Sequence, residues 1–365
     1  MTTSRMGSNS EAAKPTLGFS LVVPMRNEEH YIEETLNSLI AQDYPAGMFE
    51  ILVVDGRSTD ASRDIVTRLA ARHPNIRLLD NPRVIPAAAR NVGIKAAGGR
   101  FIGIVDCHSY VQPDFLATAE RLFAEMGADC LGRPVELFIP TDSYVQRVIG
   151  AARTSWLGHN VVSPRYSSAR GATSPLSVGI LYRREVFDRI GLFNESYGAC
   201  EDVEFNWRLQ RARMTTWTDP ALTAYYHPRA SLRGLFRQMA RYAYWRYRLL
   251  RAQRQAFHAS QAVPAGAALI ALVSVAGGPI GWWPLAVPVA LVGGYATINL
   301  IASVRASLRR GLRYLPVLPF AFAAIHFGAA AGFWGGVLGD LRSMAARAMR
   351  RIVRRSEPYT PGNAQ

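Results

Sequence analysis

From Ala259 to Val304 the sequence contains no charged residue. A helix needs about 20 consecutive apolar residues to cross a bilayer, so this run is long enough for two membrane-spanning helices. Residues 277–284 divide the run with glycines, prolines and two tryptophans, a combination typical of a turn at a membrane interface. The alternative is a buried helical hairpin of a soluble protein, which the length of the charge-free run disfavours. The sequence therefore predicts a chain that is attached to a membrane.

The positive charge of the chain lies beside its apolar stretches. The net charge is +15, and arginines cluster before residue 259, within residues 305–313 and again from residue 342 to residue 355. A basic chain of this kind suits nucleic acid, an anionic membrane surface or phosphorylated substrates. Because the arginines flank apolar segments, membrane topology accounts for them, and we do not expect nucleic acid as a partner.

A third apolar stretch covers residues 314–339. A third full crossing would place the arginines of the tail outside, against the rule that basic segments stay cytoplasmic. We therefore expect this stretch to be re-entrant or to lie at the interface, with the tail in the cytoplasm. Two prolines and a glycine pair favour an interrupted helix: Pro316, Pro319 and Gly335 with Gly336. Three glycines at four-residue spacing supply a face for close helix packing, which also fits a plain packed span: Gly328, Gly332 and Gly336.

Residues 229–254 have the pattern of a long amphipathic helix. An apolar stripe recurs at helical spacing: Leu232, Leu235, Phe236, Met239, Ala243 and Leu250. Arginines at every fourth position form a ladder: Arg233, Arg237 and Arg241. This composition predicts an interfacial helix that lies on anionic lipid.

Strand-like apolar segments alternate with helical periodicity through the first 228 residues. The strand segments are residues 19–23, 51–54, 76–79 and 101–105, and residues 86–97 form one of the helices between them. Such alternation predicts an α/β fold with a Rossmann-like, mostly parallel sheet and helices on both faces. Ligands of these sheets bind at the carboxyl ends of the strands.

The compartment follows from the cysteines and from the N-terminal residues. Cys107, Cys130 and Cys200 are odd in number and lack metal-ligand spacing, which favours a reducing compartment over a disulfide framework. Residues 1–17 contain no apolar signal segment, and we expect them to form a flexible lead.

An acidic residue and a histidine end the strand at residues 101–105. Asp106 and His108 are two positions apart, so on an extended chain their side chains point to the same side. One oxygen and one nitrogen ligand suit Mn²⁺ better than Mg²⁺, which prefers oxygen. Taken alone, the aspartate is equally well explained as a turn former, and a single histidine is more often a satisfied polar residue.

Other acidic residues also follow a predicted strand or begin a predicted helix. Asp55 follows the second strand, where its carboxylate can accept hydrogen bonds from a base or a ribose. Glu201 and Asp202 begin a helix, where carboxylates are favoured by the helix dipole even without a catalytic role.

The order of these motifs resembles the family 2 inverting glycosyltransferases of the GT-A fold, over about residues 18–250. The matching motifs are P-x-x-N-E at Pro24, Asn27 and Glu28, the aspartate Asp55 with its small and hydroxyl neighbours, A-R-N-x-G at residues 89–93, and the Glu201–Asp202 pair. Most relatives carry D-x-D where this chain has Asp106-Cys107-His108. In this respect the chain is similar to exopolysaccharide transferases of the succinoglycan type.

The resemblance implies roles for these residues. Asp55 contacts the nucleoside of the donor, Arg90 and Asn91 lie near it, and Pro24, Asn27 and Glu28 complete the donor site. Asp106 and His108 hold Mn²⁺ or Mg²⁺ on the donor diphosphate. Asp202, beside Glu201, takes the proton from the acceptor hydroxyl. Gln238 and Arg241 echo the Q-x-x-R-W motif of processive polysaccharide synthases, with Tyr242 in place of Trp, and are candidates for binding the diphosphate of a lipid-linked acceptor. A basic flank that follows the positive-inside rule explains this segment equally well.

The implied activity is that of a membrane-bound inverting glycosyltransferase in surface polysaccharide biosynthesis. It moves a sugar from a nucleotide-sugar donor, with a uridine nucleotide expected, to a polyprenyl-diphosphate-linked saccharide. The alternatives are transfer to polyprenyl phosphate and a non-catalytic scaffold of a polysaccharide assembly complex. A processive synthase is disfavoured, since one hairpin provides no channel.

The expected organisation has five segments in a multi-pass protein of the inner (cytoplasmic) membrane, with the catalytic domain facing the cytoplasm. These are the flexible N-terminal lead (1–17), a GT-A catalytic domain (18–228), an amphipathic interfacial helix (229–258), membrane-embedded helices (259–340) and a basic tail (341–365).

Overall fold

The computed structural model describes residues 17–132, 134–137, 141, 143–159, 166, 169–175, 179–253, 263–277 and 286–356. The predicted N-terminal lead lies outside these residues except for Leu17. The chain divides into two compact units. The sheet unit comprises Met1–Glu136, Pro164–Ser196 and Glu201–Tyr226, and the helical unit comprises Leu137–Ser163, Tyr197–Cys200 and His227–Gln365.

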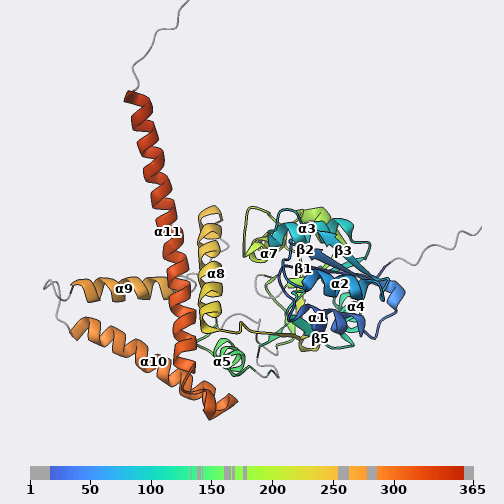
Figure 1. Cartoon of the computed structure of the whole chain (residues 1–365), viewed down its shortest axis with the longest axis horizontal. Helices are drawn as coiled ribbons and strands as arrows, with labels where there is room; N and C mark the ends of the chain where they lie inside the picture. Colours follow the sequence, from blue (N-terminus) through green and yellow to red (C-terminus); the bar gives the residue numbers. More distant parts are fainter. Residues whose placement is uncertain are drawn as a thin grey trace, which may run out of the picture. The chain divides into compact units, whose positions relative to one another are not determined.

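A mixed sheet forms the centre of the sheet unit (Figure 1). Among the described residues its eight strands follow the order β3-β2-β1-β4-β9-β6-β10-β8. Strands β1, β2, β3 and β4 are parallel, whereas β9 runs antiparallel to both β4 and β6. The strands are β1 (Phe19–Met25), β2 (Phe49–Asp55), β3 (Ile76–Asp80), β4 (Phe101–Ile104), β6 (Cys130–Gly132), β8 (Gly171–Ala172), β9 (Gly179–Arg183) and β10 (Thr216–Thr218).

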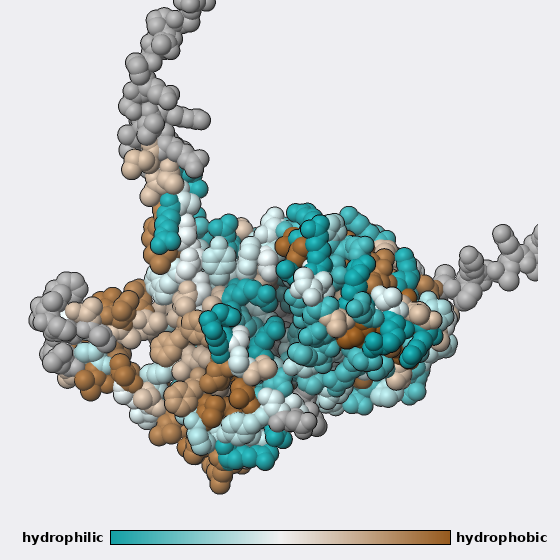
Figure 2. All heavy atoms as spheres, viewed as in Figure 1, coloured by the Kyte–Doolittle hydropathy of each residue, from teal (hydrophilic) through white to brown (hydrophobic). Residues whose placement is uncertain are grey.

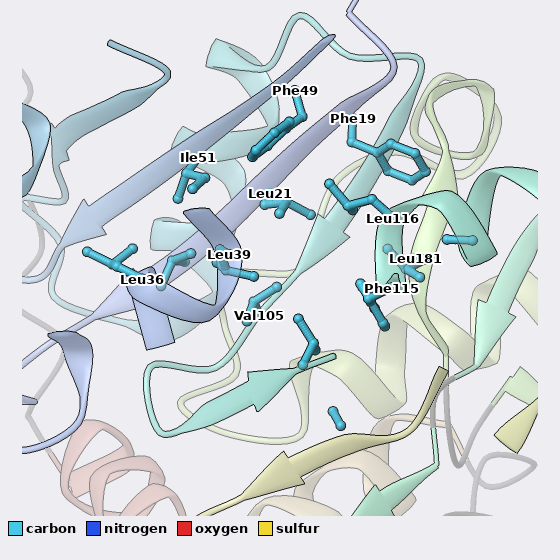
Figure 3. Close-up of a cluster of buried hydrophobic side chains, with 14 of the residues drawn as sticks. Phe19, Leu21, Leu36, Leu39, Phe49, Ile51, Val105, Phe115, Leu116 and Leu181 are labelled. Carbon is cyan, nitrogen blue, oxygen red and sulfur yellow. The ribbon is translucent and has the colours of Figure 1, made fainter. Parts of the chain in front are cut away.

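Helices cover both faces of this sheet because its central strands are apolar on both sides. In β1, Leu21 and Val23 belong to one hydrophobic cluster, while Val22 between them belongs to another. The first cluster includes Leu36 and Leu39, which pack onto the sheet as Figure 3 shows. The helices of this unit are α1 (Ile32–Ile40), α2 (Ser62–Ala70), α3 (Pro86–Ala96), α4 (Phe115–Met126), α6 (Arg184–Ile190) and α7 (Glu201–Arg211).

A second, smaller sheet lies next to the turn that follows β4. Its described strands, in the order β5-β11-β7, are β5 (Ser109–Val111), β11 (Ala224–Tyr226) and β7 (Val135–Glu136). Strand β11 is antiparallel to β5, and Tyr226 is the register partner of Ser109. The register therefore brings the end of β11 beside residues 106–108.

The helical unit is built around a close contact between two long helices. Its described helices are α5 (Tyr144–Arg153), α8 (Leu232–Ala252), α9 (Val263–Gly277), α10 (Ala286–Arg310) and α11 (Leu318–Ser356). A Cβ atom at Gly332 of α11 would lie 1.9 Å from the Ala240 carbonyl oxygen of α8, and one at Gly336 would lie 2.4 Å from the Tyr247 ring. Gly328 likewise approaches Phe236. The glycine face predicted for close packing is confirmed, and its partner is α8.

The predicted interruption of the third apolar stretch is wrong, because α11 continues through Gly335 and Gly336 to Ser356. Gly336 faces the Tyr247 ring, and the helix backbone stays intact around both glycines. Asp340 on α11 is 2.9 Å from the Tyr247 hydroxyl and also pairs with Arg248 and Arg251. Part of the face of α8 that we expected to meet lipid therefore packs on protein.

Helices α9 and α10, in contrast to this face of α8, expose apolar side chains. Leu272 is 66% exposed and Val289 is 69% exposed, and Figure 2 shows hydrophobic residues gathered over these helices. Among the described residues, Ala286–Arg310 and Leu318–Arg347 are long and apolar enough to cross a membrane by length and composition, and Val263–Ser274 is shorter.

Candidate active site

The loops that follow β1 and β2 are joined by hydrogen bonds. Asn27 adopts a left-handed backbone conformation with φ of 54°, and its Oδ1 accepts a hydrogen bond from the Thr59 N–H at 2.8 Å. The N–H of Asn27 donates to Ser58 Oγ at 3.0 Å, and the N–H of Glu28 donates to Ser62 Oγ at 2.7 Å. The P-x-x-N-E motif therefore fixes the shape of the strand ends.

Asp55 lies at the carboxyl end of β2 and is 3% exposed. Its Oδ1 accepts hydrogen bonds from the Ser58 N–H at 3.0 Å and from Ser58 Oγ at 2.7 Å. Its Oδ2 is 3.0 Å from Arg63 Nη1, which also reaches Asp80 at 2.7 Å. A depression of about 390 Å³ opens here, lined by Asp55, Arg57, Ser58, Arg63, Asp80, Asn81 and Pro82. Polar groups that converge at the strand ends of such a sheet suit a nucleoside.

His108 contacts polar groups from two other segments. Its Nε2 is in hydrogen-bond contact with the Tyr226 hydroxyl, and the two rings meet edge to face with centroids 4.4 Å apart. Its Nδ1 is 3.4 Å from Glu28 Oε1. This nitrogen is buried and has no hydrogen-bond partner in the described part of the chain.

The residue between Asp106 and His108 has a structural role. The Cys107 thiol donates a hydrogen bond to the carbonyl of Pro24 at 3.0 Å, and burial raises the pKa of Cys107 well above its ordinary value. A thiol that stays protonated is a poor metal ligand.

The described residues contain no group of three or more His, Cys, Asp or Glu side chains placed to hold a metal ion. The predicted pair, Asp106 and His108, nevertheless fits a divalent cation in its chemistry. The buried Nδ1 of His108 lacks a partner, and the carboxylate of Asp106 belongs to the same turn. An imidazole nitrogen and a carboxylate oxygen suit Mn²⁺, whose remaining ligands would come from a donor diphosphate.

Arg90 on α3 and Glu201 on α7 form a buried ion pair, with Nη1 and Oε1 2.8 Å apart. The Arg90 guanidinium also lies over the Phe193 ring, 5.2 Å from its centroid. Burial raises the pKa of Glu201, although the charge of Arg90 opposes this shift. Burial alone would lower the pKa of Arg90, but nearby carboxylates raise it above its ordinary value, so the guanidinium stays charged. Those carboxylates are Glu201, Asp202 and Asp106.

Asp202 occupies the first turn of α7 and is partly exposed. Its Oδ1 accepts a hydrogen bond from the Val203 N–H at 2.9 Å. Asp202 and Asp106 both act on Arg90 through their charge. The charges of both aspartates, predicted from distant motifs, therefore act on one arginine.

The side chain of Asn91 forms hydrogen bonds with the loop that precedes α7. Its Nδ2 donates to the Phe193 carbonyl at 2.9 Å and to Glu195 Oε1 at 2.8 Å, and its Oδ1 accepts from the Phe193 N–H at 2.9 Å. Glu195 is in turn paired with Arg83. The side chain of Asn91 thus places the residues that carry Phe193 under Arg90.

Gln238 and Arg241 lie on α8 in the helical unit. Gln238 is 5% exposed, its Oε1 accepts a hydrogen bond from Arg153 Nη1 at 3.3 Å, and its Nε2 is 3.2 Å from the Tyr242 hydroxyl. Arg241 is exposed, and its guanidinium lies 5.9 Å from the centroid of the Tyr242 ring.

Sequence reasoning missed several residues of the site. Arg63 and Asp80 carried a detectable signal, because they lie at the start of a helix and the end of a strand beside Asp55. Tyr226 and Phe193 carried none, since their positions depend on strand register and on a loop far away in the sequence.

The sequence matches one family model and is similar to several known proteins. The family model described as "Glycosyl transferase family 2" matches residues 20–191. The "Succinoglycan biosynthesis protein ExoA" of Rhizobium meliloti (strain 1021) is 30% identical over 336 residues, which are 89% of this chain and 96% of the relative. The "Dolichyl N-acetyl-alpha-D-glucosaminyl phosphate 3-beta-D-2,3-diacetamido-2,3-dideoxy-beta-D-glucuronosyltransferase" of Methanococcus voltae is 28% identical over 231 residues, 61% of this chain and 71% of the relative.

A solved structure is also similar. The mannosyltransferase PcManGT from Pyrobaculum calidifontis, in complex with GDP-Man and Mn²⁺, has 22% sequence identity and a TM-score of 0.56. The match covers 88% of this chain and 89% of that one. This likeness confirms the fold class expected from the sequence.

Proposed function

The chain belongs to glycosyltransferase family 2, and from this premise we propose that it transfers a sugar from a nucleotide-sugar donor to a polyprenyl-diphosphate-linked saccharide. The reaction inverts the anomeric centre and serves exopolysaccharide assembly, in line with the name of the Rhizobium meliloti relative. The observation that carries the proposal is the buried Arg90–Glu201 ion pair, which lies beside Asp202 on α7 and whose guanidinium is influenced by the charges of Asp202 and Asp106.

Asp202 is the general base of the proposed reaction. Its carboxylate accepts the proton of the acceptor hydroxyl while that oxygen forms a bond to the anomeric carbon. The bond from the anomeric carbon to the donor diphosphate breaks on the opposite side. A positioned base of this kind contributes about 10²–10⁴-fold to the rate. Glu201 is unsuited to the same role, because it is 4% exposed and paired with Arg90.

Negative charge develops on the leaving diphosphate, and groups of this site can stabilise it. Arg90 is held charged by its carboxylate neighbours and supplies fixed positive charge. Asp106 and His108 would hold the divalent cation. When bound, that cation supplies Lewis-acid stabilisation of the departing diphosphate.

The nucleoside of the donor occupies the depression at Asp55. The carboxylate of Asp55 is oriented by Ser58 and Arg63, so it presents a fixed set of acceptor atoms. Asn27, Glu28 and Pro24 shape the neighbouring loop. We expect a uridine nucleotide in this position.

The acceptor is lipid-linked in this proposal. The name of the Methanococcus voltae relative describes transfer onto a dolichyl-linked sugar phosphate, which supports a lipid-phosphate acceptor here. Arg241 is exposed and able to contact an acceptor diphosphate, whereas Gln238 serves to orient its neighbours through Arg153 and Tyr242. Transfer to polyprenyl phosphate is the alternative acceptor chemistry. A non-catalytic scaffold is disfavoured by the retained base and donor residues.

The charge-free run of residues 259–304, which contains α9 and most of α10, is the proposed membrane hairpin. Helix α11 packs on the arginine-rich α8 from Gly328 to Asp340. An arginine at the bilayer centre costs at least about 2.5–3.5 kcal/mol, so α8 and this part of α11 lie outside the hydrocarbon. The rest of the apolar part of α11 is then too short to cross. The tail consequently stays with the catalytic domain on the cytoplasmic side.

The direct test uses the full chain purified in detergent, with Mn²⁺, a lipid extract and a panel of nucleotide sugars. Release of nucleoside diphosphate together with labelled lipid-linked product is the expected result for one donor. A catalytically silent scaffold would release nothing above the level of a boiled control with any donor.

A further inference from the structure

His108 lies between an oxygen of Tyr226 and an oxygen of Glu28. A neutral imidazole carries a proton on one nitrogen and a lone pair on the other. The hydrogen-bond partners of the ring therefore decide which nitrogen can bind a metal.

Tyr226 is held firmly in its position. It ends β11, its register partner is Ser109 on β5, and it is 8% exposed. Its ring meets the imidazole at an interplanar angle of 84°. The hydroxyl is thus fixed at Nε2 by the small sheet and by ring packing.

The two contacts of the imidazole are unequal. Nδ1 and Glu28 Oε1 are 3.4 Å apart, and Nδ1 has no hydrogen-bond partner among the residues that the structure describes. The contact of Nε2 with the Tyr226 hydroxyl is a hydrogen bond. A buried N–H without an acceptor costs free energy, so the ring proton is placed on Nε2, where the Tyr226 oxygen can accept it, and the lone pair is left on Nδ1.

We propose that Tyr226 is a positioning residue that accepts a hydrogen bond from Nε2–H of His108 and thereby presents Nδ1 to the divalent cation. The inference rests on the metal site of the proposed function. Histidine ligands in proteins usually donate their second ring N–H to an oxygen, which fixes the tautomer and the ring orientation. A phenol hydroxyl fulfils that condition here.

Binding of Mn²⁺ alone to the full chain in detergent, followed by electron paramagnetic resonance of the free ion, tests the first consequence. Tyr226→Phe removes only the hydroxyl and should raise the Kd by about 10-fold or more, as loss of such a partner does at other sites. Tyr225→Phe is the matched control, because Tyr225 is adjacent on β11 and its ring stacks on Tyr110 instead. An unchanged or lower Kd in Tyr226→Phe, with the expected loss in His108→Ala, overturns the role of Tyr226 alone. An unchanged Kd in His108→Ala removes the metal assignment itself, and the inference with it.

The tautomer provides a readout that a general loss of stability would not reproduce. Histidine labelled with ¹⁵N in the ring should give, in the metal-free protein, an His108 spectrum with Nε2 protonated and Nδ1 unprotonated. The His108→Gln variant identifies these signals by their absence. Tyr226→Phe should mix the two tautomers, whereas Tyr225→Phe should not. Protonation of Nδ1 in the unaltered protein contradicts the proposal.

Discussion

Arg90 and Glu201 are 111 positions apart in the sequence, and their side chains meet at 2.8 Å in the interior of the sheet unit. The pair joins α3 to the first turn of α7, where Asp202 is the next residue. It therefore links the position of the proposed base to the position of Arg90, the residue that we propose stabilises the leaving diphosphate.

Glu201→Gln should destabilise the sheet unit because it leaves Arg90 buried without its charged partner. Removing one partner of a buried ion pair costs about 3–5 kcal/mol in the free energy of unfolding. Glu33→Gln is the control, since Glu33 pairs with Arg68 at the surface and such pairs contribute about 0–1 kcal/mol. Chemical denaturation followed by circular dichroism measures both variants. Equal losses in the free energy of unfolding in the two variants would contradict a larger contribution from the buried pair.

The double variant Arg90→Met with Glu201→Leu separates stability from catalysis. Replacing both members of a buried pair by apolar residues is often neutral for stability. The protein should stay folded but lose transfer activity, because the positive charge near Asp106 and Asp202 is gone. Full activity in the folded double variant would argue against a role for Arg90 in receiving the leaving group.

Asp55→Asn should weaken nucleoside diphosphate binding. The substitution removes the charge that Arg63 pairs with and one of the fixed acceptor atoms of the depression. Hydrogen bonds to charged groups are worth about 1.5–3 kcal/mol, which corresponds to roughly a 10- to 150-fold rise in Kd. Isothermal titration calorimetry with nucleoside diphosphate measures this Kd. Arg68→Ala, on the exposed face of the same helix as Arg63, should leave the Kd unchanged. Comparable losses in both variants would place the nucleoside elsewhere.

Gly332→Ala should disrupt the contact between α8 and α11. The new Cβ would lie 1.9 Å from the Ala240 carbonyl oxygen, so the helices must separate. Overpacking of this kind costs about 1–3 kcal/mol or more. Gly335→Ala is the matched control, because a Cβ there meets nothing within 4 Å. Thermal unfolding in detergent should show a lower midpoint for Gly332→Ala only. Identical midpoints would contradict the packing of these two helices.

The side of the membrane reached by α11 can be read by cysteine labelling. Leu312→Cys lies between α10 and α11, and Ala345→Cys lies beyond the part of α11 that packs on α8. An impermeant maleimide should label both positions from the cytoplasmic side only. The native cysteines are buried and serve as the background in the parent protein. Labelling of position 345 from the outside would mean that α11 crosses the membrane.

The parts of this molecule that could be predicted from sequence are those that depend on local pattern. The apolar runs that stop at Asp55 and Asp106 identify two strands, and the helical spacing of Gly328, Gly332 and Gly336 identifies a packing face. The pattern does not name the partner of that face. The sequence predicts that α8 lies on lipid, and the structure packs part of its surface on α11.

Other features depend on contacts between distant segments. The pairing of His108 with Tyr226 follows from the register of β11 on β5, and the Arg90–Glu201 pair follows from the placement of α3 and α7 on one face of the sheet. The predicted break at Gly335–Gly336 failed for a related reason. Glycine weakens an isolated helix, but close packing against α8 stabilises this one.

The central claim is that Asp202 deprotonates an acceptor hydroxyl while the donor is held separately at the other residues of the site. The decisive measurement compares Asp202→Asn with the unaltered protein in transfer rate and in nucleoside diphosphate binding, with Asp188→Asn on the exposed surface of α6 as the control. The account predicts a loss of transfer of about 10²-fold or more with an unchanged Kd for the nucleotide. Retained transfer in Asp202→Asn would contradict it.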